Sequence, residues 1–233
     1  MSTVAKKVIM GGGAVDAYEI DQSIILNAVS DPNIYRQAAA TGNRRTFTYS
    51  CWVKFSSATA GWIVGCGDAG DNTKATLELQ ADATLRVNIW NSGVAGKLDT
   101  NAVFRDFSAW YHLVLAVDTT QGTAANRLKL YVNGTQITSF STATYPSQNY
   151  DTAFGLDDHF IQVAQNAYWQ TSNTYNNGMD GNIAEVHILD GVAKAPSDFG
   201  ETNEDTGQWI PKEYTGGSYG TNGFYGKFVS GAL

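Results

Sequence analysis

One segment of the chain specifies a β-hairpin almost on its own. Residues 127–140 read RLKLYVNGTQITSF, with apolar and polar side chains alternating on both sides of Asn133-Gly134. Asparagine followed by glycine suits the two positive-φ positions of a type I′ turn, which joins antiparallel strands. With that turn Val132 pairs with Thr135, and the apolar side chains of both strands share one face. The hairpin therefore predicts an antiparallel sheet that is buried on one side.

The same two-residue alternation recurs along most of the chain. In Phe47–Phe55 the odd-numbered side chains are apolar or aromatic, and most of the even-numbered ones are polar. Tyr111–Asp118 is nearly continuously apolar, as expected for a central strand covered on both faces. Further strands are predicted at Ser23–Val29, Leu77–Leu79, Leu85–Ile89, Phe160–Ala164, Asn182–Leu189 and Gly223–Val229. Many short strands with almost no helical periodicity predict an all-β antiparallel sandwich.

The composition and charge exclude several classes of protein. Apolar residues make up 43% of the chain, which argues against disorder. The net charge is −7 and no basic cluster exceeds a pair, so nucleic acid is disfavoured as a partner. No uncharged apolar stretch approaches the length of about 18 residues that a membrane helix needs. Gly11-Gly12-Gly13 interrupts the N-terminal region before any apolar run, which predicts no secretion signal and assembly in a cytosol.

The two cysteines allow two interpretations. If Phe47–Phe55 formed a hairpin with Trp62–Cys66, Cys51 would lie opposite Cys66, close enough for a disulfide. In a reducing cytosol, two buried free thiols that pack as small apolar side chains are favoured over that bridge.

Beyond these local patterns, the order of motifs resembles a known family. The segments FTYSCWVKF, WIVGCG, FSAWYHLVLAVD, NRLKLYVNGTQITSF and GNIAEVHILDG follow one another along the chain. The most specific pieces are Trp110-Tyr111-His112, Tyr131–Gly134 and Gly181–Val186. Together they resemble the laminin-G-like branch of the concanavalin A-like lectin/glucanase superfamily. The resemblance implies a jelly-roll sandwich of two curved antiparallel sheets over residues 20–200, with an N-terminal arm at 1–19. Residues 201–233 would form a C-terminal extension that packs on the sandwich or on a partner.

The segments flanking this region carry a second resemblance. Residues 198–225 are similar to a segment that follows such domains in tailed-bacteriophage virion proteins, and Tyr18–Ser23 resembles their first strand. This implies a non-enzymatic virion protein, a capsid decoration or tail-fibre component, assembled in the host cytoplasm. Its partners would be other virion proteins, copies of itself and a host-surface glycan. The alternative is a carbohydrate-binding lectin that recognises a host receptor.

An active glycosidase is the third and least favoured reading. Retaining glycosidases need two carboxylates about 5–5.5 Å apart, and sandwich glucanases place them on alternate residues of one strand. The matching strand here offers Glu185, but the residue two positions on is His187. We therefore expect no enzymatic activity and expect the Glu185 carboxylate to be hydrogen-bonded or solvated. The isolated histidines His112 and His159 fit no zinc motif either.

Two sets of residues are candidates for binding. Between Ser141 and Gly181 only Phe160–Ala164 has strand character, and long polar loops rich in Tyr, Trp and Asn suit either sugar stacking or protein contact. The predicted glycan- or protein-binding residues are Tyr145, Tyr150, Tyr168, Trp169, Tyr175 and Asn176. No cofactor is required, but calcium is the one metal that the family resemblance implies, with oxygen ligands in two loops. The candidate ligands are Asp68, Asp71, Asp157 and Asp158, although ordinary Asp/Gly turns explain the same residues.

Overall fold

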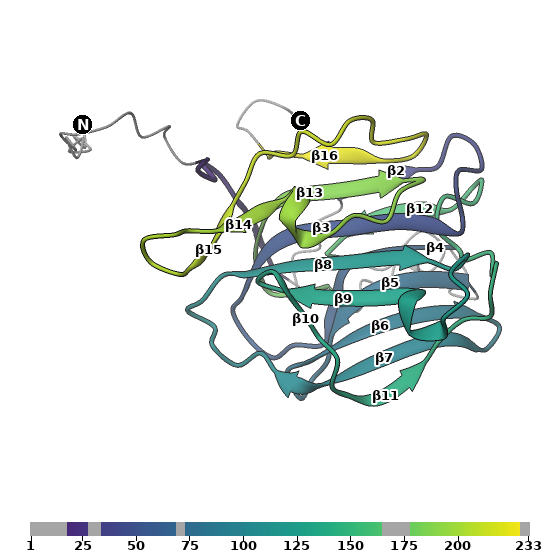
Figure 1. Ribbon diagram of the computed structural model, residues 1–233, viewed down its shortest axis with the longest axis horizontal. Coiled ribbons are helices and arrows are strands. Elements are labelled where there is room, and N and C mark those ends of the chain that lie inside the picture. The colour runs from purple at the N-terminus through teal and green to yellow at the C-terminus, as the bar shows by residue number, and fades with distance from the viewer. Residues whose placement is uncertain (1–17, 28–33, 69–72, 165–177, 229–233) are drawn as a thin grey trace.

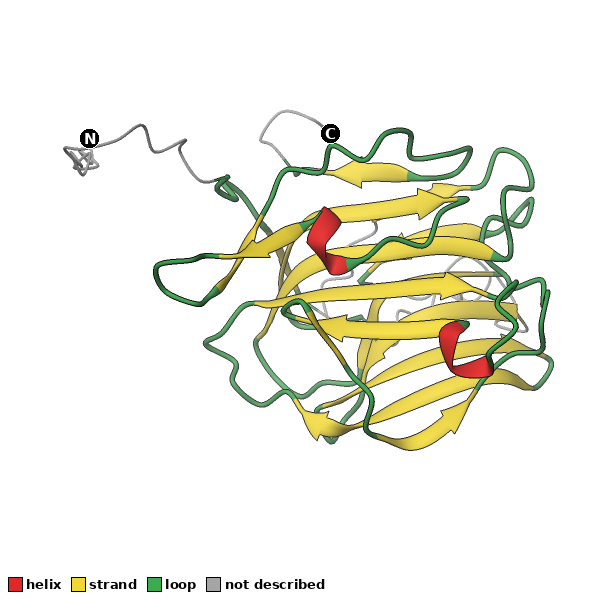
Figure 2. Ribbon diagram, viewed as in Figure 1, coloured by secondary structure: helices red, strands yellow, loops and turns green. Residues whose placement is uncertain are grey.

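The computed structural model describes residues 18–27, 34–68, 73–164 and 178–228. Two antiparallel sheets of seven strands lie face to face, and a two-stranded hairpin projects from one end (Figures 1 and 2). The predicted all-β sandwich is confirmed. Within the described ranges, no helix has the length and apolar character needed to cross a membrane.

Sheet A contains the strands at both ends of the chain. Its order is β1-β13-β3-β8-β9-β10, and β16 also pairs with β13. The strands are β1 (Ile24–Leu26), β3 (Thr46–Phe55), β8 (Tyr111–Asp118), β9 (Leu128–Val132), β10 (Thr135–Gln136), β13 (Gly181–Asp190) and β16 (Phe224–Gly226). Along one edge of β13, β1 pairs with residues 181–183 and β16 with residues 186–188. The two chain ends therefore share a single sheet edge.

Sheet B lies behind sheet A in the view of Figure 1 and has the order β11-β7-β6-β5-β4-β12-β2. Its strands are β2 (Ile34–Gln37), β4 (Gly61–Gly67), β5 (Thr73–Leu79), β6 (Thr84–Asn91), β7 (Val94–Val103), β11 (Phe140–Thr144) and β12 (Phe160–Val163). The projecting hairpin consists of β14 (Gly200–Thr202) and β15 (Trp209–Pro211), and two short 3-10 helices span Ala124–Asn126 and Pro196–Asp198.

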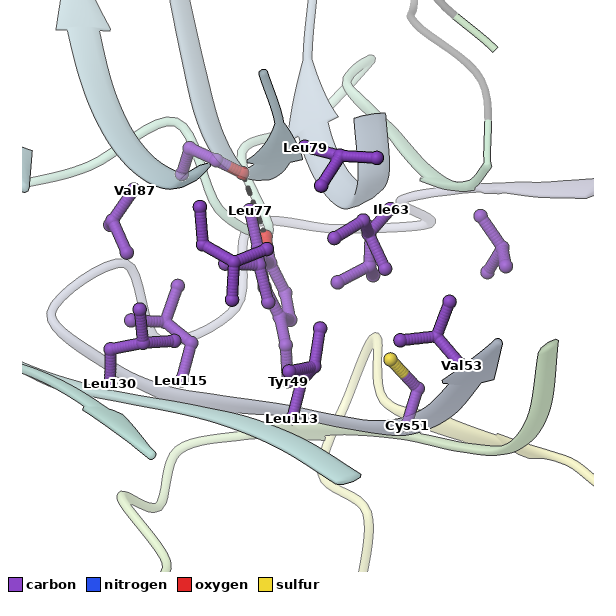
Figure 3. Packing of buried hydrophobic residues seen from close by; sticks show 14 of the residues in the cluster. Tyr49, Cys51, Val53, Ile63, Leu77, Leu79, Val87, Leu113, Leu115 and Leu130 are labelled. Carbon is purple, nitrogen blue, oxygen red and sulfur yellow. Dashed lines mark hydrogen bonds between the residues drawn. The ribbon is translucent and has the colours of Figure 1, made fainter. Parts of the chain in front are cut away.

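The core fills the space between the inner faces of the two sheets. Leu113, Leu115 and Val53 from sheet A meet Ile63 and Leu77 from sheet B, and all are fully buried (Figure 3). Alternation places these side chains inward, because successive residues of a strand point to opposite faces. One polar group also spans this core. The hydroxyl of Tyr49 on β3 donates to the carbonyl oxygen of Ala75 on β5 at 3.1 Å.

The predicted hairpin and central strand are confirmed. Asn133 and Gly134 have φ angles of 47° and 78°, and Val132 pairs with Thr135 across the turn. The central strand β8 has the predicted bounds and is buried along nearly all its length.

The predicted pairing of Phe47–Phe55 with Trp62–Cys66 is wrong. β3 pairs with β13 and β8, whereas β4 belongs to the other sheet and pairs with β5 and β12. Alternation identifies a strand but not its partner. The short link between β3 and β4 is compatible with a hairpin within one sheet and equally with a connection from one sheet to the other. Cys51 and Cys66 point into the core from opposite sheets, and both are buried free thiols, as favoured.

A second correction concerns the segment after Ser141. It was expected to lack strand character up to Phe160, but Phe140–Thr144 forms β11 at the edge of sheet B. Its side chains are largely exposed, so the apolar alternation that marks a half-buried strand is absent from its sequence.

The chain after β13 lies across the outer face of sheet A. Phe199 is buried there against Val114 and Leu189, and Tyr214 and Tyr219 pack on the same cluster. This second apolar cluster explains why sheet A is buried on both faces.

Candidate functional site

Glu185 is the acid on β13 for which we expected a hydrogen-bonded or solvated carboxylate and no catalytic partner. It lies in a β-bulge of β13, where the register to β3 shifts between Ala184 and His187, and its φ angle is 49°. The side chain is buried, and both carboxylate oxygens accept hydrogen bonds. Tyr18 donates to Oε2 and Tyr225 donates to Oε1, each at 2.7 Å. We call Glu185, Tyr18 and Tyr225 the clasp, because it ties both chain ends to β13.

The groups around Glu185 keep its carboxylate ionised and hydrogen-bonded. Burial raises its pKa, but the neighbouring His187 and the hydrogen bonds from Tyr225 and Tyr18 outweigh that effect, so the pKa is lowered overall. His187 Nε2 lies 3.7 Å from Glu185 Oε2, and Nδ1 of the same ring is hydrogen-bonded to the Tyr219 hydroxyl at 2.9 Å. No second acid follows on β13 before Asp190, whose own carboxylate accepts amide hydrogens.

The predicted binding residues fall in two groups. Tyr145 and Tyr150 are half-buried and pack against the main core, so their rings support the sandwich. The other four predicted residues, Tyr168, Trp169, Tyr175 and Asn176, lie outside the described residues. The structure therefore brings none of the six together into a described site, and their role stays a prediction.

The two predicted calcium loops lie side by side. The Asp68 carboxylate accepts the backbone N–H of Thr73 at 2.8 Å, and the Thr73 hydroxyl is hydrogen-bonded to His159 at 2.7 Å. His159 directly follows Asp157 and Asp158, whereas Asp71 lies outside the described residues. Within the described ranges, no group of three or more His, Cys, Asp or Glu side chains is placed to hold a metal ion. Calcium binding stays a prediction.

A different surface emerges from the strand register of sheet B. Each strand of sheet B contributes one residue to a row that crosses the outer face of the sheet, and each residue lies opposite its neighbours in the row. In order it consists of Tyr35, Gln162, Gly65, Thr76, Asn88, Lys97 and Thr144. The row is polar except at Gly65, where a Cβ would lie 2.7 Å from the Thr76 methyl carbon. A neighbouring row places Arg86 between Glu78 and Asp99.

These rows border a hollow of about 240 Å³ on the outer face. It is lined by Ala60, Gly61, Trp62, Lys74, Glu78, Leu79, Gln80, Arg86 and Asn88. We call it the sheet-B hollow. The Lys74 ammonium lies 5.8 Å from the centroid of the Trp62 ring, close enough for a cation–π contact.

Fixed ion pairs and hydrogen bonds hold the charged groups of this face. Arg86 donates to Asp99 Oδ1 at 2.6 Å, and the Lys97 ammonium lies 3.2 Å from Oδ2. Burial raises the pKa of Asp99, but the hydrogen bonds from Arg86, Thr142 and Lys97 outweigh it and lower the pKa overall. The Glu78 carboxylate accepts from the Thr76 hydroxyl and the Gln80 amide.

Two amide side chains on this face have atoms without a hydrogen-bond partner among the described residues. Asn88 Oδ1 is buried in the wall of the hollow and has no hydrogen-bond partner among the described residues. Gln162, in the same row, is fully buried, and neither atom of its amide has a partner there. An unpaired buried polar group costs about 1–3 kcal/mol. Such groups mark positions where a polar ligand or an ordered water improves the fit.

Sequence reasoning missed this hollow although its signal is present. The alternation of β5 and β6 that identifies Leu77 and Val87 as core residues also assigns Lys74, Glu78 and Arg86 to the opposite face. The neighbourhood of β4 and β5 was missed because the predicted strand Trp62–Cys66 was paired with Phe47–Phe55 instead.

The comparisons with known proteins agree with this architecture. A laminin-G-type family model, described as the concanavalin A-like lectin/glucanases superfamily, matches residues 30–197. A search of curated protein sequences finds no match.

Solved structures with the same architecture share little sequence with the chain. It is similar to the native heptameric SAP-like pentraxin from Limulus polyphemus, with a TM-score of 0.54 and 14% identity over 77% of this chain and 80% of that chain. It is also similar to domain 4 of AbnA, an extracellular arabinanase from Geobacillus stearothermophilus in complex with arabinotriose. There the TM-score is 0.50 with 18% identity over 80% of this chain and 79% of that chain. Domains LG4–5 of the mouse laminin α1 chain give a TM-score of 0.50 and 12% identity over 81% of this chain and 50% of that chain. At these identities the likeness shows the fold alone.

Proposed function

The chain belongs to the concanavalin A-like lectin/glucanases superfamily, and on that premise we propose that it is a non-enzymatic, glycan-binding component of a phage virion. The observation that carries glycan binding is the sheet-B hollow. It offers the unpaired acceptor Asn88 Oδ1 beside the cationic side chains of Lys74 and Arg86. A sugar hydroxyl can donate to the first and accept from the others, because a hydroxyl is both donor and acceptor.

Two buried acids, Asp99 and Glu185, support a binding role without hydrolysis. Glycosidases need one carboxylic acid that can donate a proton to the leaving group. The lowered pKa of Asp99 keeps it ionised beside Arg86, and both oxygens of Glu185 are held in the clasp. Neither carboxylate is arranged as a proton donor.

The virion context rests on the two flanking segments. Residues 198–225 and Tyr18–Ser23 resemble segments of tailed-phage virion proteins, and in this structure both contribute to the covered outer face of sheet A. A capsid decoration or tail-fibre component would use sheet B as its outward, glycan-binding face. Contacts with other virion proteins and copies of itself would complete the assembly.

Glycan binding is tested by an array probed with the wild-type protein, Asn88→Ala and Asn91→Ala. Asn91 ends the same strand but does not line the hollow. We expect Asn88→Ala to lose about tenfold or more of the wild-type affinity for the bound glycan, the scale of one hydrogen bond to a ligand hydroxyl. Asn91→Ala should bind as the wild type does. Equal binding by Asn88→Ala, or no glycan bound by the wild type, would contradict the proposal.

Two further measurements test the other parts. Incubation with the bound glycan should release no new reducing ends, and hydrolysis that disappears in Glu185→Gln would overturn the non-enzymatic role. A density map of the phage particle should locate the chain on the capsid or tail. A protein found only outside particles would favour the alternative of a freestanding lectin.

A further inference from the structure

A groove of about 290 Å³ lies on sheet A, on the other side of the molecule from the sheet-B hollow. It is lined by Ile20, Asp21, Gln22, Ser23, Trp52, Trp110 and Pro211. We call it the tryptophan groove. The N-terminal segment and the β14–β15 hairpin lie at the same end of the molecule (Figure 1). Residues 20–23 and Pro211 fall outside the range 30–197 that matches the family, so the chain ends supply part of the groove, while Trp52 and Trp110 lie within the matched range.

The floor of the groove is the end of an aromatic stack. Trp209 stacks on His112 with ring centroids 6.0 Å apart, and His112 stacks on Trp52 at 5.0 Å. Beyond Trp52 the same cross-strand row continues to Ala184 on β13, which presents only a methyl group. Ala184 is fully buried and does not line the groove, whereas Trp52 is 7% exposed and does. A ligand in the groove can therefore contact the accessible part of the Trp52 indole.

The aromatic stack carries no positive charge at neutral pH. The Trp209 indole, which can only donate, donates to His112 Nδ1 at 2.9 Å. The imidazole proton is consequently on Nε2, where Ser50 Oγ accepts it at 3.0 Å. Burial lowers the pKa of His112 to about 3. No imidazolium therefore lies behind Trp52 to repel a cation.

The walls of the groove are held in place by contacts already described. Tyr18, at one end of the polar wall, is fixed by Glu185, and Ile24 at the other end pairs with Ile183. On the opposite side, the hydrogen bond from Trp209 to His112 anchors the strand that carries Pro211. A preformed site loses less freedom on binding than one that must be ordered.

The lining combines aromatic faces with a single charge. Trp110 is 36% exposed, and Asp21 is the one charged residue among the described residues that line the groove. A cation over an indole face is attracted by the ring quadrupole, and a nearby carboxylate adds Coulombic attraction. We propose that the tryptophan groove binds an organic ammonium group, with its alkyl carbons against Trp52 and Trp110 and its charge toward Asp21. This site is separate from the sheet-B hollow and does not depend on glycan binding there.

The test uses pairs of probes that differ in charge and little else. Choline is titrated against the neutral alcohol in which carbon replaces the choline nitrogen, and glucosamine against glucose, with tryptophan fluorescence and indole N–H chemical shifts as readouts. We expect choline or glucosamine to bind at least about tenfold more tightly than its neutral counterpart, and added salt to weaken binding. Which of the two cations binds better distinguishes an alkylammonium group from an amino sugar as the source.

Variants locate the binding in the groove. Asp21→Asn and Trp110→Ala should each weaken cation binding by about tenfold. Asp205→Asn removes the same charge from the loop between β14 and β15, outside the lining, and should bind as the wild type does. Because Asp21 and Trp110 are both partly exposed, circular dichroism should show that these variants fold.

Three results would overturn the proposal. The first is equal affinity for the cationic and neutral probes, which would indicate that the groove binds its ligands without regard to their charge. The second is cation binding that is unchanged in both Asp21→Asn and Trp110→Ala. The third is no cation binding together with a dimer that dissociates in Trp110→Ala, which would assign the groove to contact between copies of the chain.

Discussion

At the scale of single residues, the outer face of sheet A is unusual for its buried polar side chains. His112, Glu185 and His187 are each at most 5% exposed. Each is hydrogen-bonded by a side chain from the ends of the chain, namely Trp209, Tyr18 with Tyr225, and Tyr219. Buried polar groups are tolerated when they are paired in this way. The partners come from segments far away in sequence, so the residues themselves do not reveal the pairing.

His112 makes the stability of the fold dependent on pH. Its pKa is about 3 in the folded chain and about 6.5 in an unfolded one. Between these values the unfolded chain binds a proton that the folded chain does not. The free energy of unfolding therefore falls as the pH falls, by at most about 1.4 kcal/mol per pH unit.

Urea unfolding at pH 7 and pH 5 checks this dependence. Between these two values the wild type should lose about 2 kcal/mol more of its unfolding free energy than His112→Gln does. The comparison with the variant is needed because burial also lowers the pKa of His159. If both proteins lost the same amount, His112 would not be buried as the neutral form.

At the scale of elements, the hairpin of β9 and β10 is specified by its own turn residues and also contacts segments that are distant in sequence. Asn133-Gly134 specifies the turn locally. The turn also contacts the C-terminal hairpin, since a Cβ on Gly134 would lie 2.5 Å from the Trp209 ring. The Asn133 side chain accepts the backbone N–H of His112 at 2.7 Å.

Gly134→Ala should therefore destabilise the fold. The change places a Cβ at a φ of 78° and against the Trp209 ring, and we expect a loss of about 1–3 kcal/mol. Gly122→Ala is the matched control, because a Cβ there meets nothing within 4 Å. Thermal unfolding of both variants measures the difference, and hydrogen exchange in β14 and β15 should rise only in Gly134→Ala. Equal melting temperatures would show that the hairpin tolerates the change.

The elements differ in how far they could be predicted. Strands whose sequence shows apolar alternation, such as β3, β6 and β9, were identified close to their observed bounds. Edge strands β2, β11 and β14 were not identified, because an exposed strand carries no such pattern. The sheet-B hollow was missed for a different reason: Trp62–Cys66 was paired with Phe47–Phe55, whereas it pairs with β5.

At the scale of the whole molecule, one core joins two sheets that share no strand. Cys51 and Cys66 point into it from opposite sides and are fully buried. Burial raises the pKa of each thiol to about 12. The reactive thiolate is therefore scarce in the folded protein, and access of a reagent requires the sandwich to open.

Thiol labelling should consequently report global unfolding. We expect both cysteines to react with a thiol reagent at one common rate, which rises with urea in proportion to the unfolded fraction. Iodoacetamide labelling followed by mass spectrometry measures each site. If Cys66 reacted quickly in the native protein while Cys51 did not, sheet B would open separately from sheet A.

The amino-acid sequence by itself determined the secondary-structure class, the NG hairpin, the central strand and the inward faces, because these depend on residues that are neighbours in the chain. It also carried the family, through motifs in a fixed order. Only the tertiary structure decided which strands pair, that β3 and β4 belong to different sheets, and that both chain ends close over β13. The tryptophan groove belongs to this second group. It combines side chains from distant segments, and long-range pairing is a property of the whole chain that no local pattern specifies.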